Sequence, residues 1–409
     1  MADYPIFTES MKSTHTILIP DMLPVHFSLI TKVFKSYGYN MELLTTSTRE
    51  VVDEGLKNVH NDTCYPALLV IGQFMEALKS GRYDVNRVAL MITQTGGGCR
   101  ASNYIHLLRK CLKHTFPNVP VISLNFSGLD KEGAFKITAP MFIKLLYTIL
   151  YGDMLMVIYN QCKPYELVSG QSDKVRTDLA NTIGEYFLNG NEYTNTKKIY
   201  KMILNTFAKV ERSKEPKVKV GIVGEIYVKY SPLANNHLEE FLISEGCEPV
   251  VPTLLEFCLY CAISKVNDGR LYDFFNKNTL FNGIGYKFIL AKHREFNQAI
   301  KDHGVFTAPH DFEHLRTLAD KYINQGVNMG EGWLITAEMA MLVETGTENV
   351  ICTQPFGCLP NHIVAKGMSR VIKNAYPNAN LVAIDYDPGA TKVNQENRIK
   401  LMLANAKLT

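Results

Sequence analysis

Two features are missing from this sequence of 409 residues: a long uninterrupted hydrophobic run and a strong excess of charge of one sign. The longest apolar stretch, residues 141–162, is interrupted by Lys144 and Asp153, so we expect no membrane-spanning helix. The first residues show no basic segment followed by an apolar run, which predicts no signal peptide and favours a cytoplasmic protein. The formal net charge is only +3, with acidic and basic residues interspersed, so nucleic acid is not an expected partner.

The nine cysteines lack the close pairing that is typical of structural zinc sites, and their odd number argues against a disulfide framework. In a large chain of cytosolic type, such cysteines favour metal or redox use of some of them. Cys258 and Cys261 do form a Cys-x-x-Cys, but no turn residue lies beside them, so we expect a buried helix face. Cys111, Cys162 and Cys247 are likewise predicted to lie in the core.

Strand-like and helix-like segments alternate in two parts of the chain, which predicts parallel, doubly wound sheets. In the first part we predict strands at 14–19, 41–45, 87–93 and 119–125, and helices at 25–37, 48–57, 67–79 and 101–114. In the second part we predict strands at 218–225, 349–353 and 381–385, and helices at 333–343, 362–375 and 394–404. The predicted fold class is α/β with two Rossmann-like domains.

Three segments follow from this pattern, because 46% hydrophobic residues and this length are enough for two or three cores. We predict a first α/β domain at 1–139, a helical connector at 140–212 and a second α/β domain at 213–409. The polar run at 211–217 marks the second boundary. A helical, aromatic-rich region near 254–301 is predicted to be an insertion in the second domain.

Three cysteines lie on turns at strand ends or helix starts. Cys99 follows a strand-like stretch through the turn at 96–98, Cys358 follows a similar stretch in the second half, and Cys64 precedes a helix. The carboxyl ends of strands line the ligand crevice of open α/β sheets. We therefore expect Cys99 and Cys358 to point into the space between the domains, and Cys64 to reach the same space.

Thiols contributed by two domains fit an iron-sulfur cluster better than zinc, so we predict Cys64, Cys99 and Cys358 as cluster ligands. Cys352 is the predicted fourth ligand, although it lies earlier, inside its strand. Helix amides near Cys64 and Cys99, and the backbone at 96–98, are expected to lower the thiol pKa and to donate hydrogen bonds to sulfur. The alternative is that these cysteines are small buried residues on tight turns.

The segments at 61–67, 94–104, 330–333, 354–362 and 383–390 resemble the cluster-binding portion of 2-hydroxyacyl-CoA dehydratase-related iron-sulfur proteins. Within that group they resemble the dehydratase-like portion of the large activase-related members, over most of the chain. The resemblance implies an oxygen-sensitive [4Fe-4S] protein of anaerobic metabolism. It also implies that an ATP-driven activator delivers a low-potential electron to the cluster protein.

The chain departs from that group in lacking a phosphate-binding loop, so the ATP-dependent activator would be a separate chain. The dehydratases proper use three cysteines per cluster and leave one iron open to substrate, whereas a fourth thiolate favours outer-sphere electron transfer. We therefore expect a redox protein for electron transfer or reductive activation. One alternative is a dehydratase-type lyase whose open iron binds a 2-hydroxyacyl-CoA, and another is a cluster-free regulatory or assembly protein. The resemblance makes a dimer possible.

Four further residues are candidates near the expected cluster. Arg100 and Asn103 follow Cys99 on the first helical turn, where they could support the ligands or bind a substrate phosphate. Glu331 and Trp333 hold the place in the second half that Cys64 holds in the first, so we expect them to line the same cleft.

A group of histidines, His303, His310 and His314, stands among acidic residues and could bind a metal. Its spacing matches no common metal site, which favours a solvated loop.

Overall fold

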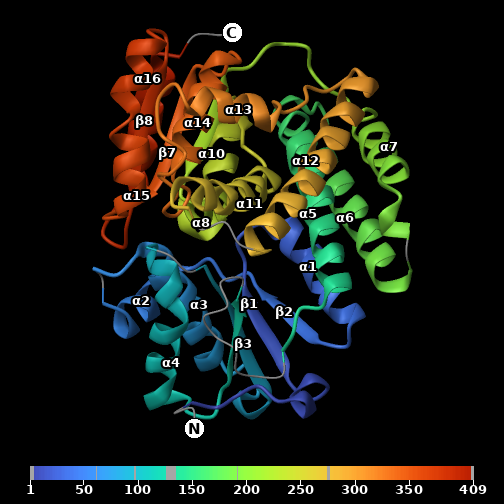
Figure 1. Cartoon of the computed structure of the whole chain (residues 1–409), viewed down its shortest axis with the longest axis vertical. Coiled ribbons are helices and arrows are strands. Elements are labelled where there is room, and N and C mark those ends of the chain that lie inside the picture. The colour runs from blue at the N-terminus through green and yellow to red at the C-terminus, as the bar shows by residue number, and fades with distance from the viewer. Residues whose placement is uncertain are drawn as a thin grey trace.

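Two four-stranded, all-parallel sheets form the centres of two successive α/β units (Figure 1). The computed structural model describes residues 4–60, 62–95, 98–125, 135–190, 192–273 and 277–406. The first sheet has the order β2-β1-β3-β4, and its strands are β1 (Thr16–Pro20), β2 (Asn40–Leu44), β3 (Val88–Gln94) and β4 (Val121–Asn125). The second has the order β6-β5-β7-β8, from β5 (Lys219–Gly224), β6 (Glu248–Val250), β7 (Asn349–Pro355) and β8 (Asn380–Tyr386). The predicted fold class is confirmed, and both halves share one strand order.

The first unit carries the predicted helices α1 (Pro24–Ser36), α2 (Arg49–Asn58), α3 (Tyr65–Lys79) and α4 (Tyr104–Thr115). Nearly every residue of α3 is buried, as its continuous apolar sequence requires. Gly55 of α2 and Gly72 of α3 allow these two helices to touch. A Cβ atom on Gly72 would lie 2.0 Å from the Val51 carbonyl oxygen. The close approach therefore depends on the missing side chain.

The connector consists of α5 (Ala139–Asn160), α6 (Gln171–Asn189) and α7 (Thr196–Phe207). Helix α5 packs against α1 of the first unit and against α11 (Leu254–Leu271) and α12 (Lys277–His303) of the second. By length and composition alone, the segment Ala139–Tyr165 is the one helix in the described residues that could cross a membrane, yet 72% of its most apolar stretch is buried. The connector thus ties the two units together.

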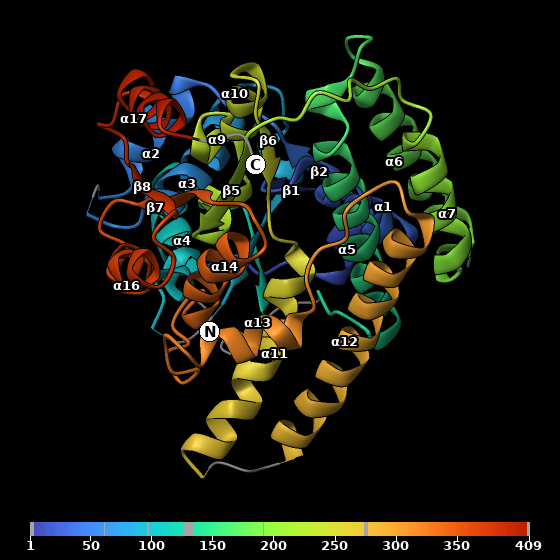
Figure 2. The ribbon, with the colours of Figure 1, turned by 90° about the horizontal axis from the view of Figure 1, so that it is seen from above.

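The second unit is covered by a larger set of helices: α8 (Ile226–Tyr230), α9 (Pro232–Asn235), α10 (Leu238–Ser244), α13 (Phe312–Ala319), α14 (Trp333–Glu344), α15 (Leu359–Asn361), α16 (Ser369–Ala375) and α17 (Lys392–Ala404). The predicted helical insertion is present as α11 and α12, which pack against each other and extend away from the sheets (Figure 2). The helix predicted at 362–375 is instead a π-helical turn, His362–Lys366, followed by α16. Strand β6 and the short helices α8 to α10 were not predicted.

Candidate cysteine site between the two α/β units

Three cysteines occupy the same kind of position, the residue that caps the N-terminus of a helix. Cys64 caps α3, Cys99 caps the 3-10 helix Arg100–Asn103, and Cys358 caps α15. Cys99 and Cys358 follow β3 and β7, which are the corresponding inner strands of the two sheets. Helix N-termini carry unpaired amide hydrogens, so each of these positions favours a negatively charged sulfur.

These three thiols come from both units and are near enough to act on one another's charge. The ionisation of Cys64 is affected by both Cys99 and Cys358, although Cys358 lies in the other α/β unit. The units also meet where a Cβ atom on Gly98 would lie 2.2 Å from Met329 Sδ. The carboxyl ends of the two sheets therefore face each other across the cysteines, which is the arrangement expected from the sequence. The role of the thiols as cluster ligands stays a prediction.

Burial dominates the acidity of the three thiols. It raises the pKa of Cys99 to about 11 and that of Cys358 to about 12, and it raises the pKa of Cys64 well above its ordinary value. The amide of Ala101 lowers the pKa of Cys99 and that of Asn361 lowers the pKa of Cys358, but burial outweighs both. The expectation of a lowered thiol pKa is therefore wrong in its net sign. Two of the glycines expected to help, at 96 and 97, lie outside the described residues.

Cys352 lies apart from this group. It is fully buried in β7, and its thiol donates a hydrogen bond to Met339 Sδ of α14 at 3.2 Å. Burial, followed by the charge of Glu338, raises the pKa of Cys352 to about 12. Its side chain thus packs beneath the sheet against α14, and the structure does not bring it to the other three thiols.

Two carboxyl groups complete the site, and sequence reasoning identified only one of them. Glu225 caps α8 and accepts a hydrogen bond from the Val228 amide at 2.8 Å, while Glu331 accepts one from the Ile226 amide at 2.9 Å. Both affect the ionisation of Cys99 and Cys358, and Glu225 also affects Cys64. Burial, followed by the charge of Glu331, raises the pKa of Glu225 to about 8.

Glu225 reaches this place because of the glycine before it. Gly224 has φ +135°, and a Cβ atom there would lie 1.9 Å from the Thr353 carbonyl oxygen. Only glycine tolerates this backbone and this contact between β5 and β7. The sequence signal for this position is the Val-Gly-Glu at the end of the predicted strand 218–225.

Asn361 links a carboxylate with a thiol. Its Nδ2 atom donates to Glu331 Oε2 and to Cys358 Sγ, each at 3.4 Å. A side-chain amide that donates to sulfur stabilises the thiolate form, so Asn361 lowers the pKa of Cys358, although burial outweighs it.

The four further candidates from the sequence do not all lie beside the thiols. Glu331 is buried beside the thiols, as expected. Trp333 is fully buried in the core, with its ring 5.2 Å from that of Tyr260, so the expectation that it lines the cleft is wrong. Arg100 and Asn103 are exposed immediately after Cys99, where both can meet a ligand from solvent.

The remaining cysteines mostly follow expectation. Cys162 and Cys247 are buried, and Cys111 is half-buried. On α11, Cys258 is half-buried while Cys261 is exposed, so the prediction of a buried helix face is wrong for Cys261.

The donors are not arranged around one metal ion in the described residues. Within the described ranges, no three side chains of cysteine, histidine, aspartate or glutamate are placed to hold one metal ion. A single zinc ion needs all its ligands about 2.0–2.3 Å from one centre. In a cubane each thiolate binds a different iron, so its ligands stand further apart than those of a single ion. Burial raises the pKa of all three thiols, so a metal bound there would have to displace the thiol protons.

Comparison with known proteins gives no family for this chain: no protein-family model matches it, and no curated protein matches it.

Proposed function

We propose that this chain is a cytoplasmic iron-sulfur protein that binds a [4Fe-4S] cluster between its two α/β units. Cys64, Cys99 and Cys358 would hold the cluster, and a separate ATP-dependent activator would reduce it. When bound, such a cluster stores one low-potential electron for transfer or reductive activation in a 2-hydroxyacyl-CoA dehydratase-like system. The observation that supports this most is the meeting of three helix-capping thiols from both units.

One observation favours the lyase as the second candidate. Cys352 is buried in β7 and bonds to Met339, which leaves three of the four predicted ligands for a cluster. A cluster with three thiolates keeps one iron without a protein sulfur, which is where a 2-hydroxyacyl-CoA oxygen would bind. Glu225, with a pKa raised to about 8 by burial and by Glu331, is then a proton donor beside that substrate.

Iron and acid-labile sulfide content, with EPR of the dithionite-reduced protein after anaerobic purification, tests the proposal. We expect about four irons per chain. Replacing Cys99 or Cys358 by alanine should remove the EPR signal, while Cys352→Ala, the matched control, should keep it. Protein without iron after anaerobic reconstitution, or an unchanged signal in Cys99→Ala, would contradict the proposal.

Addition of a 2-hydroxyacyl-CoA separates the two candidates. A shift of the EPR signal would support an open iron and the lyase. An unchanged signal would support a protein that only transfers electrons.

A further inference from the structure

The outer half of α12 carries large apolar side chains on its exposed side. The helix extends with α11 away from the two sheets (Figure 2). On it, Leu280 is 61% exposed, Phe281 75%, Ile284 62% and Phe288 45%. Side chains this exposed contribute little to the core of the second unit, so the stability of that core does not explain them.

The spacing of these residues is that of a coiled-coil seam. Phe281, Ile284, Phe288 and Ala291 follow one another at intervals of three, four and three residues, and all four are exposed. A helix with such a repeat of a and d positions pairs with another helix through knobs in holes. We call these four residues, with Leu280 beside them, the α12 seam. A separate set of α12 residues is buried: Thr279, Tyr286, Leu290 and His293.

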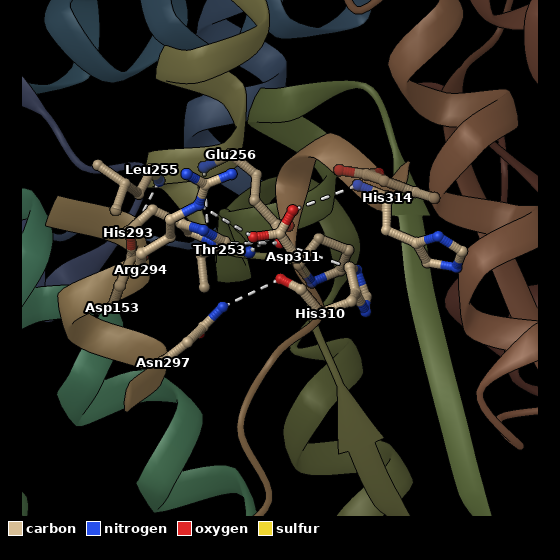
Figure 3. A network of polar contacts seen from close by, with 12 residues as sticks. Asp153, Thr253, Leu255, Glu256, His293, Arg294, Asn297, His310, Asp311 and His314 are labelled. Atoms are coloured by element: carbon tan, nitrogen blue, oxygen red, sulfur yellow. Dashed lines mark hydrogen bonds and ion pairs between the residues drawn. The ribbon is translucent and has the colours of Figure 1, made fainter. Parts of the chain in front are cut away.

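The α12 seam is held in a fixed orientation. At the base of the hairpin, Arg294 Nε of α12 donates a hydrogen bond to Asp311 Oδ2 at 3.3 Å (Figure 3). Near the outer end α11 and α12 touch, since a Cβ atom on Gly269 would lie 2.7 Å from Thr279 Cγ2. Both ends of the described hairpin are therefore tied down, and the seam faces solvent.

The area of the seam is large enough for an interface between two copies. At about 150–250 Å² for a large side chain, its four large residues together expose on the order of 450 Å². Two copies would bury roughly 900 Å² from these side chains alone, close to the 1,000 Å² or so that a specific interface needs. Gly285 lies beside the seam with nothing within 4 Å of its missing side chain, so its backbone adds to the contact.

The sizes of the side chains indicate a second copy of the chain in antiparallel orientation. In an antiparallel pair each a position faces a d position of the other helix, so Phe281 faces Ala291 and Ile284 faces Phe288. The most exposed ring of the seam thus meets its smallest side chain. In a parallel pair Phe281 would meet its own copy, and so would Ala291, which overfills one layer and leaves a gap in another.

We propose that two copies of this chain associate through the α12 seam, with the two α12 helices antiparallel and Ile284 of each copy packed against Phe288 of the other. The contact is made by side chains of α12 alone. It therefore does not depend on a cluster in the cysteine site.

Lys287 gives this pairing a recognisable dependence on salt. It is exposed and flanks the seam near its centre, so the antiparallel pair brings the two Lys287 ammonium groups near each other. Salt screens this repulsion, and we expect association to tighten as the salt concentration rises from about 0.05 to 0.5 M. An anionic membrane or an acidic partner bound at the same lysine would be released by salt instead.

Sedimentation velocity over a range of protein concentrations tests the proposal. The mass should rise from 46.1 kDa toward twice that value as the concentration increases. Ile284→Glu should weaken association about tenfold or more, because it places a charge at the centre of the seam. Leu401→Glu is the matched control, since it changes a similarly exposed residue on α17 and should leave association unchanged.

An exchange of side-chain sizes tests the antiparallel register. Ala291→Phe should weaken association about tenfold, because two phenylalanine rings then meet in one layer. The double variant Phe281→Ala with Ala291→Phe again places one large and one small side chain in that layer. It should recover association to within about threefold of the unaltered protein.

A protein that is still monomeric at about 100 μM overturns the proposal, because an interface of this size should form below that concentration. A dimer that Ile284→Glu leaves intact overturns it as well, and so does a double variant that recovers nothing. Association that weakens with salt contradicts the pairing of the two lysines. Binding of a monomer to anionic lipid vesicles, lost in Ile284→Glu, would assign the seam to a membrane surface instead.

Discussion

Lys229→Met should be one of the most destabilising single changes in the second unit. The ammonium group is almost wholly buried and lies among four carboxyl groups, those of Glu225, Glu256, Glu331 and Glu338. Methionine keeps the length of the side chain and removes a cation that lowers the pKa of all four. Removing one partner of a buried ion pair typically costs about 3–5 kcal/mol, and we expect a loss in that range.

Glu338→Gln should lower the free energy of unfolding by less than Lys229→Met does. This difference ties the prediction to the buried charges. Glutamine keeps the shape of the side chain, and Lys229 retains the other three carboxyl groups. We expect a loss of about 1–2 kcal/mol. The pKa of Glu338 is raised from 4.5 to about 7, so its ionisation opposes folding and stability falls as pH rises between these values. The cost of Glu338→Gln should therefore shrink between pH 5 and pH 7.

Urea unfolding followed by tryptophan fluorescence measures both variants. Trp333 is the single tryptophan of the chain, and it is buried on α14, the helix that carries Glu338. The double variant Lys229→Met with Glu338→Gln completes the cycle and should cost less than the two single losses together. A loss below about 1 kcal/mol in Lys229→Met would refute this account of the buried charges. A loss in Glu338→Gln that exceeds the loss in Lys229→Met would refute it as well.

Three further predictions concern the fold around the site. Gly72→Ala places a Cβ atom 2.0 Å from the Val51 carbonyl oxygen and should cost about 3 kcal/mol or more in urea unfolding, whereas Gly190→Ala, with nothing within 4 Å, should be nearly neutral. Asp153→Ala removes an acceptor for His26 Nε2 at 3.0 Å and for two amides of α11 at 2.9 Å, and should cost about 3–5 kcal/mol in the same assay. Burial raises the pKa of Asp21 from 3.8 to about 7, so its ionisation opposes folding as pH rises. Asp21→Asn should gain stability relative to the unaltered protein from pH 5 to pH 7, by at most about 1.4 kcal/mol per pH unit, measured by urea unfolding at each pH.

The sheets could be predicted because their strands are buried apolar runs separated by helical periodicity. Strand β6 escaped this reasoning because Glu248–Val250 is three residues long and contains a proline. Helices α8 and α9 are also too short to show a full period, and Pro232 divides them. The helix expected at 362–375 changes geometry at the π-helical turn, which no periodic pattern indicates.

A site residue could be predicted from the sequence only where its position in the chain fixes its place in the fold. Cys64, Cys99 and Cys358 sit at helix starts, and the topology then fixes which edge of the sheet they occupy. Trp333 and Cys352 were misplaced for another reason. A strand covered on both faces is apolar throughout, so its sequence does not tell which face a cysteine takes, and a tryptophan at a helix start follows its hydrophobicity into the core.

The buried charges around Lys229 were out of reach of any local pattern, because they come from α8, α11 and α14 and from the residues before α8 and α14. In the sequence, each of them is an ordinary polar residue of a helix or loop. The fold places Lys229 Nζ of α8 3.3 Å from Glu338 Oε1 of α14, although the two residues are 109 positions apart in the sequence. If the pair supports the fold, the cost of Lys229→Met must depend on Glu338, and the double variant measures that dependence directly.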